Sequence, residues 1–278
     1  MSEGCPSIRQ MTLHADHITG TSTNLDDVDI ELVSAQARSG GDEVALLFVH
    51  GLGHGAWCWE RWQAMAVDRG VDSWAMSYRG HGNSGGTVRR ATLSAYVQDV
   101  RRTIDHLAPR PIVLVGHSLG GLIVQRIMAE TVPEAVRGAV LLSSVSRGPA
   151  ISSVLAVAAH HPVQALRFIA GLPMRLPERL LFSEAGGHAA QMHRLRADSP
   201  LVQYQLLFHR GAAVSDKPVL VVGGAGDRLV PLATQLRTAR RYGAEVQVID
   251  HVGHDLMLES AGDCGLDAII RWSKRLPG

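Results

Sequence analysis

The chain has 278 residues, of which 46% are hydrophobic and 19% charged, and its formal net charge at pH 7 is +1. Lys and Arg (27) nearly balance Asp and Glu (26), so the composition argues against a nucleic-acid-binding protein and against a disordered chain. The length suits one large domain with an extensive core.

Short apolar segments alternate with segments of helical periodicity along most of the chain. In chain order we expect strands at 12–17, 28–33 and 44–49, a helix at 57–69, a strand at 71–77, a helix at 92–107, a strand at 111–115, a helix at 121–130, strands at 138–143 and 217–223, a helix at 231–242, a strand at 245–249 and a helix at 260–274. Apolar strands that alternate with helices predict an α/β fold, with a mostly parallel central sheet flanked by helices on both faces.

Residues 147–215 interrupt this alternation. The segment is rich in Ala, Leu, Arg and His, contains five prolines and shows no buried-strand pattern. We expect a helical cap, or lid, inserted into a core formed by residues 1–146 and 216–278 and placed over the C-terminal edge of the sheet, where open α/β folds bind ligands. A separate domain is the alternative, but the segment is short for one. Its apolar residues are expected to line a substrate pocket or to pack the cap on the core.

Residues 116–120 (Gly-His-Ser-Leu-Gly) lie between the expected strand at 111–115 and the expected helix at 121–130. A G-x-S-x-G sequence in this strand–turn–helix context predicts a nucleophile elbow with Ser118 at its tip. The glycines permit a sharp turn, and the free N–H groups and dipole of the following helix favour negative charge beside the serine. The alternative is a glycine-rich turn that contains a serine by chance.

Two further residues stand where the partners of an activated serine are expected. A serine needs a base to remove its proton, and the base needs a third group that orients it. Asp227 follows the strand at 217–223, and His254 follows the strand at 245–249. Taken singly, they would be a turn or helix-capping aspartate and a surface histidine. The order Ser118, Asp227, His254, each at the C-terminal end of a strand, predicts a catalytic triad instead.

Neighbouring residues compete for these roles. Asp250 and Asp255 flank the predicted base, but neither ends a strand with the Gly-Asp spacing of Asp227. His251 competes with His254, which better fits the expected context of a preceding glycine and a following apolar run. We therefore retain Asp227 and His254.

Four histidines of the cap raise the alternative of a metal site. They are His160, His161, His188 and His193. No carboxylate or cysteine completes a ligand set with them, so we expect solvated helix faces and no metal.

The cysteines and the N-terminal residues bear on the compartment. Cys5, Cys58 and Cys264 are far apart and odd in number, which suggests no disulfide framework and suits a reducing compartment. Cys58 is expected to be a buried packing residue. The N-terminal residues show no secretory signal, and no apolar stretch is long enough to span a membrane. We expect a cytoplasmic monomer or small homo-oligomer.

From about residue 44 onward the chain resembles the α/β-hydrolase superfamily. The resemblance rests on His50-Gly51-Leu52-Gly53, Arg79-Gly80-His81-Gly82-Asn83-Ser84, Gly116-His117-Ser118-Leu119-Gly120-Gly121, Gly226-Asp227 and Gly253-His254. It implies an α/β-hydrolase fold in which Ser118 is the nucleophile, His254 the general base and acid, and Asp227 the group that orients His254. It also implies an oxyanion hole formed by the backbone N–H groups of Leu52 and Leu119, no cofactor, and a His117 that points away from the site.

The same resemblance narrows the chemistry. Residues 78–84 resemble bacterial carboxylesterases and monoacylglycerol-lipase-like proteins, and residues 54–59 resemble the corresponding loop of plant methylesterases and hydroxynitrile lyases. We expect a small-molecule substrate, a carboxylic ester of small or medium size and mostly apolar, hydrolysed through an acyl-Ser118 intermediate. A serine nucleophile argues against haloalkane dehalogenases and epoxide hydrolases of this fold. A lactonase, a thioesterase, a C–C bond hydrolase, a haloperoxidase-like activity and a non-hydrolytic lyase or small-molecule receptor stay open as alternatives.

Overall fold

The computed structural model describes residues 18–25, 27–37, 44–146, 148, 150–183, 189–208 and 214–276. Eight strands form one sheet in the order β1-β2-β4-β3-β5-β6-β7-β8. They are β1 (Ile18–Leu25), β2 (Val28–Ala35), β3 (Ala45–Val49), β4 (Ser73–Met76), β5 (Ile112–His117), β6 (Val136–Leu142), β7 (Val219–Gly224) and β8 (Glu245–Ile249). β2 pairs antiparallel with β1 and β4, and the other neighbouring strands pair parallel. The expected mostly parallel sheet is confirmed.

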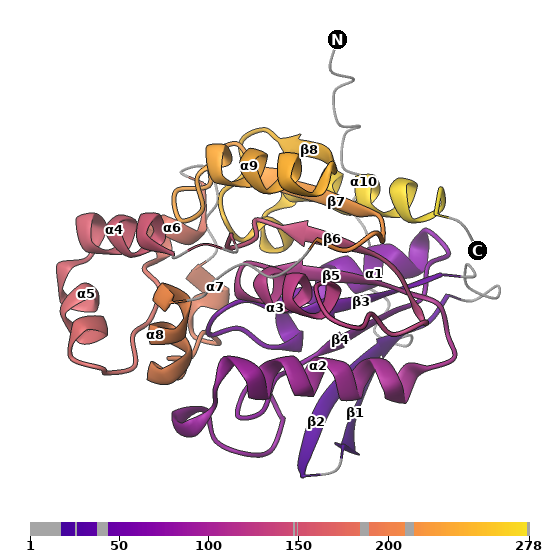
Figure 1. The fold of residues 1–278 in the computed structure, drawn as a ribbon, viewed down its shortest axis with the longest axis horizontal. Coiled ribbons are helices and arrows are strands. Elements are labelled where there is room, and N and C mark those ends of the chain that lie inside the picture. The colour runs from indigo at the N-terminus through magenta and orange to yellow at the C-terminus, as the bar shows by residue number, and fades with distance from the viewer. Residues whose placement is uncertain are drawn as a thin grey trace.

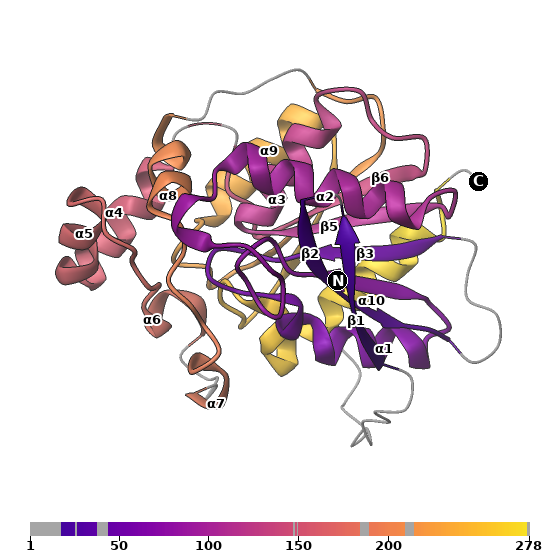
Figure 2. The same ribbon diagram turned by 90° about the horizontal axis from the view of Figure 1, so that it is seen from below.

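Helices cover both faces of this sheet (Figure 1). Those of the core are α1 (Glu60–Asp68), α2 (Leu93–Leu107), α3 (Leu119–Met128), α9 (Leu232–Tyr242) and α10 (Asp263–Ser273). Figure 2 shows α2, α3 and α9 on one face of the sheet and α1 and α10 on the other. Short 3-10 turns occur at Ala56–Trp59, Val88–Arg90, Leu256–Leu258 and Ser260–Gly262.

The central strands are apolar on both sides because helices cover both of their faces. Every residue of β3, β5 and β7 is buried, which is the pattern expected of strands inside a doubly covered parallel sheet. Their C-terminal ends lie at one edge of the sheet because they run parallel. The loops that follow these strands therefore meet at that edge, and they carry the candidate site.

The N-terminal edge of the sheet differs from the expectation. The strand predicted at 12–17 lies outside the described residues, and β1 at Ile18–Leu25 was not predicted. Its sequence, Ile-Thr-Gly-Thr-Ser-Thr-Asn-Leu, is polar and largely exposed along an edge, so it shows no apolar alternation from which a strand could be recognised.

Between β6 and β7 the described residues contain helices and no strand. These helices are α4 (Ile151–His160), α5 (Pro162–Ile169), α6 (Glu178–Leu181), α7 (Ala189–Met192) and α8 (Pro200–Phe208). They gather at one end of the molecule in both views (Figures 1 and 2). We refer to this helical segment as the cap; its limits at 147 and 215 stay a prediction. Among the described helices, none has the length and apolar character needed to cross a membrane.

The cysteines differ from the expectation in one respect. Cys58 is free and buried, as expected of a packing residue, and its burial raises the pKa of the thiol well above its ordinary value. Cys264 is disulfide-bonded, whereas the cysteine spacing suggested no disulfide. The cytoplasmic location stays a prediction.

Candidate active site

Ser118 occupies the turn between β5 and α3 in a backbone conformation that few L-residues adopt. Its φ is 51° and its ψ is −113°, which costs on the order of 1–3 kcal/mol. Neighbouring hydrogen bonds hold it there, since Ser118 N donates to Leu142 O at 3.0 Å and Val145 N donates to Ser118 O at 3.1 Å. The strained turn places Ser118 between the end of β5 and the start of α3.

The glycines of the elbow are required by close backbone contacts. A Cβ at Gly116 would lie 2.6 Å from Gly120 O, and a Cβ at Gly120 would lie 2.3 Å from Val49 O. Separations this short are not sterically allowed, so no other residue fits at either position without a shift of the backbone.

His254 and Asp227 are joined by a hydrogen bond. His254 follows β8, is fully buried, and its Nδ1 lies 2.9 Å from Asp227 Oδ2. The other oxygen of Asp227 accepts from the backbone N–H groups of Leu229 (2.9 Å) and Val230 (2.8 Å). One oxygen of Asp227 therefore caps the loop after β7, and the other orients the imidazole. Because a carboxylate accepts, Nδ1 carries the proton and Nε2 presents a lone pair.

The charge of Asp227 alters the basicity of His254. Burial of the imidazole opposes its protonation, but the neighbouring Asp227 carboxylate outweighs this effect through its charge and its hydrogen bond. Asp255 acts in the same direction, and the pKa of His254 is raised above its ordinary value of 6.5. His254 is thus a stronger base than a free histidine.

Ser118 Oγ and His254 Nε2 are not hydrogen-bonded to each other. Nε2 of His254 is buried and has no hydrogen-bond partner. Catalytic hydrogen bonds of this kind are often loose without substrate and tighten when it binds. No hydrogen bond among the described residues occupies the lone pair of Nε2.

The residues that could have replaced Asp227 or His254 in these roles are exposed or have other partners. Asp250 and His251 are exposed in the turn after β8, and His251 has φ 60°. Asp255 is buried, but its Oδ2 lies 3.0 Å from His54 Nε2, and this neighbouring histidine lowers the pKa of Asp255 despite its burial. Asp227 is therefore the carboxylate hydrogen-bonded to His254.

His117 packs behind the elbow. Its Nε2 donates to His254 O at 3.0 Å, and burial together with the nearby His254 lowers its pKa to about 3. A neutral His117 supports the backbone of the histidine loop, and this contact suits the packing role that the resemblance implied.

One cluster of potential metal ligands occurs among the described residues. His117, His254 and Asp255 each have a ligand atom within 4.8 Å of the others. His117 donates to His254 O, His254 Nδ1 donates to Asp227, and Asp255 is hydrogen-bonded to His54, so we interpret the grouping as a polar network. Of the cap histidines, His160 and His193 are exposed, and His188 lies outside the described residues.

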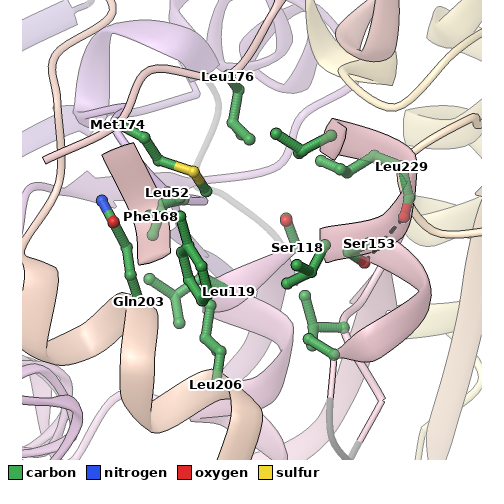
Figure 3. A pocket seen from close by; sticks show the side chains of 14 residues that line it. Leu52, Ser118, Leu119, Ser153, Phe168, Met174, Leu176, Gln203, Leu206 and Leu229 are labelled. Carbon is green, nitrogen blue, oxygen red and sulfur yellow. Dashed lines mark hydrogen bonds between the residues drawn. The ribbon is translucent and has the colours of Figure 1, made fainter. Parts of the chain in front are cut away.

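A pocket opens at Ser118, and Figure 3 shows the serine hydroxyl pointing into it. Its wall is almost entirely apolar, with Val157, Phe168, Met174 and Leu206 contributed by the cap. The polar lining residues besides Ser118 are Ser153, which donates to Leu229 O at 2.8 Å, and Gln203, which donates to Asp198 O at 3.2 Å. No charged side chain lines this pocket within the described part of the chain.

The two predicted oxyanion donors lie at this pocket. Leu52 and Leu119 both line it beside Ser118. Leu119 is the first residue of α3, where the N–H groups have no partner within the helix. Among the described residues, no backbone acceptor takes the N–H of either leucine.

The sequence assigned no role to several buried polar residues near the site. They include His54, Gln235, His81 and Asp198. Asp198 illustrates why, since it accepts a hydrogen bond from Gly53 N, 145 positions away in the sequence. Only the folded chain brings these residues together.

Comparisons with known proteins bear on the family and the fold. The profile of the alpha/beta hydrolase family matches residues 46–264. The dihydrolipoyllysine-residue acetyltransferase component of the acetoin cleaving system of Cupriavidus necator is 30% identical over 82% of this chain, which spans 63% of that relative's length. The monoacylglycerol lipase of Mycolicibacterium smegmatis is 28% identical over 73% of this chain and 78% of its own. A thermophilic esterase from Thermogutta terrifontis has a similar structure, with a TM-score of 0.68 and 22% identity over 93% of this chain and 98% of the esterase.

Proposed function

Because the chain belongs to the alpha/beta hydrolase family, we propose that it is a serine hydrolase that cleaves carboxylic esters of small or medium, apolar substrates. The observation that carries this proposal is the buried His254 imidazole, which is bound to Asp227 through Nδ1 and keeps an unpartnered Nε2. Its ring centroid is 4.8 Å from that of His117, the residue before Ser118. We assign Ser118 as nucleophile, His254 as base and Asp227 as the group that orients it.

The steps follow from these assignments. His254 Nε2 takes the hydroxyl proton as Ser118 Oγ attacks the ester carbonyl carbon, and the carbonyl oxygen becomes an oxyanion. The N–H groups of Leu52 and Leu119 stabilise that oxyanion, and one such donor contributes roughly 2.7–4 kcal/mol. The C–O bond then breaks, the alcohol takes the proton from His254, and an acyl-Ser118 ester remains. Water, deprotonated by His254, releases the acid by the reverse sequence.

The pocket supports an apolar acyl or alcohol group. Each buried methylene contributes about 0.8 kcal/mol of binding, and the wall at Phe168 and Met174 offers apolar contact (Figure 3). A carboxylate on the substrate would lose its hydration without meeting a cationic side chain in the described lining. The pocket therefore disfavours dicarboxylate substrates.

Related reactions use the same steps. A lactone or thioester would be attacked at the same carbonyl carbon, and a C–C bond hydrolase would use the same three residues. A lyase or receptor of this fold would bind its ligand without forming an acyl-enzyme. Hydrolysis is favoured because the base, its orienting carboxylate and two proposed N–H donors accompany Ser118.

Hydrolysis of p-nitrophenyl acetate, butyrate and octanoate tests the proposal. We expect turnover by the wild type and its loss in Ser118→Ala. Ser153→Ala is the matched control, because Ser153 lines the same pocket but donates to a backbone carbonyl, and it should retain activity within a few-fold. Ester turnover that persists in Ser118→Ala, or tight ligand binding without turnover in the wild type, refutes the assignment.

A further inference from the structure

Gly53, in the loop after β3, is held on both sides by the segment that joins α7 to α8. Its N–H donates to Asp198 Oδ2 at 2.9 Å, and its C=O accepts from Arg196 N at 2.9 Å. The backbones are in close contact here: a Cβ on Gly53, whose φ is 74°, would lie 2.4 Å from Arg196 O. The loop that follows β3 is thus fastened to the cap.

The Asp198 carboxylate is surrounded by donors. Besides Gly53 N, Oδ2 lies 3.2 Å from His81 Nε2, while Oδ1 accepts from Tyr96 Oη at 2.9 Å and from Ser199 N at 2.6 Å. The side chain is buried. A carboxylate with four donors around it has little freedom to turn, so it defines a fixed position for Gly53.

The charge state of this cluster follows from its geometry. His81 Nδ1 lies 3.3 Å from Arg79 O, so both ring nitrogens of His81 face acceptors. Burial opposes charge on either partner, but their mutual attraction outweighs it: Asp198 raises the pKa of His81, and His81 with the backbone donors lowers the pKa of Asp198 to about 2. Both shifts favour the imidazolium–carboxylate form of the pair, and a charged acceptor strengthens the hydrogen bond from Gly53.

We propose that Asp198 is a positioning residue that fixes the oxyanion-hole loop to the cap, an inference that rests on the proposed function. Leu52, whose N–H is the proposed oxyanion donor, directly precedes Gly53. An oxyanion donor must lie within about 2.7–3.1 Å of the developing charge, so a shift of Gly53 misplaces it. Gln203 of the pocket wall (Figure 3) also donates to Asp198 O at 3.2 Å. One residue therefore links the pocket wall to the oxyanion hole.

Asp198→Asn is the direct test. The amide keeps one oxygen, so its NH2 must face the backbone N–H of either Gly53 or Ser199. We expect kcat to fall by about 10- to 100-fold with little change in KM, since loss of a whole donor costs roughly 10²–10³. Affinity for a trifluoromethyl ketone, which forms a tetrahedral oxyanion on Ser118, should fall by the same factor.

Asp72→Asn is the matched control. Asp72 is also a buried aspartate, but it precedes β4 at the opposite edge of the sheet and is hydrogen-bonded to Ala37 N and Arg110. We expect this variant to lower Tm and leave kcat unchanged. A folded Asp198→Asn protein with wild-type kcat and wild-type affinity for the ketone overturns the inference, and so does an equal fall of kcat in Asp72→Asn.

A measurement on the wild type covers the case in which Asp198→Asn does not fold. Hydrogen exchange at the Gly53 amide should be slow because this N–H is buried and donates to Asp198 Oδ2. Exchange at the rate of an exposed loop amide overturns the inference. If the wild type shows no ester turnover that depends on Ser118, the proposed function is refuted. In that case the exchange rate of the Gly53 amide still decides whether Asp198 holds the loop.

Discussion

Replacement of Asp227 by Asn changes one atom of the site and should abolish most activity. The Asp227 carboxylate accepts from four groups, Leu229 N and Val230 N at Oδ1 and His254 Nδ1 and Gln235 Nε2 at Oδ2. Asn has a single side-chain oxygen. If this oxygen stays with the two backbone donors, the amide NH2 points at His254 and at the Gln235 amide.

The size of the expected loss in kcat follows from placing an NH2 donor where the carboxylate oxygen accepts from His254. An NH2 group donates to Nδ1 and so forces the histidine proton onto Nε2, the atom that must accept the proton of Ser118. The wrong tautomer in a triad costs about 10⁴ in kcat, which is about 5 kcal/mol of transition-state stabilisation. KM should change little because Asp227 does not line the pocket. The Gln235 NH2 also loses its carboxylate acceptor, which costs about 1–3 kcal/mol of stability.

The assay is the hydrolysis of p-nitrophenyl butyrate, with kcat and KM measured separately and Tm recorded for each protein. Asp250→Asn is the matched control, because Asp250 is exposed in the turn after β8 and should leave both constants and Tm unchanged. A folded Asp227→Asn protein that keeps more than a tenth of the wild-type kcat refutes the reasoning about the tautomer.

Three further predictions concern pH, packing and the pocket. Wild-type kcat/KM should rise with pH and level off with an apparent pKa above 6.5, because His254 acts only after losing a proton that Asp227 helps to hold; a midpoint below 6.5 contradicts this. Gly120→Ala should lose roughly 1–3 kcal/mol of stability, because its Cβ would lie 2.3 Å from Val49 O in β3. The control Gly85→Ala should keep the wild-type Tm, because its Cβ would meet only ordinary contacts at 3.6 Å. Each added acyl methylene should raise kcat/KM up to about fourfold until the pocket is filled. A succinate half-ester should react more slowly than the butyrate. Equal rates across this series argue against the apolar pocket as the acyl site.

The strands of the core and the candidate triad were accessible from local sequence. β3, β5 and β7 are continuous apolar runs because helices cover both of their faces, and that pattern is visible without a structure. Ser118, Asp227 and His254 were recognisable because the parallel topology places each at the end of a strand. In the structure, Asp227 and His254 are hydrogen-bonded.

The residues that support the site could not be predicted from the sequence, because their contacts come from distant parts of the chain. Asp198 gains its significance from Gly53, His81 and Tyr96, which reach it from three other elements of the fold. No spacing in the sequence encodes such a contact. The polar edge strand β1 likewise depends on its pairing with β2, since its own residues carry no apolar pattern.

Covalent trapping tests the central claim most directly. An organophosphate such as diethyl p-nitrophenyl phosphate transfers its phosphoryl group to an activated serine and releases p-nitrophenolate, so the modified residue can be located by peptide mass spectrometry. We predict one modification per chain, on Ser118, absent from Ser118→Ala and strongly slowed in Asp227→Asn. Labelling of Ser153 in the same pocket, or an unmodified Ser118 in a protein that still turns over esters, contradicts the account.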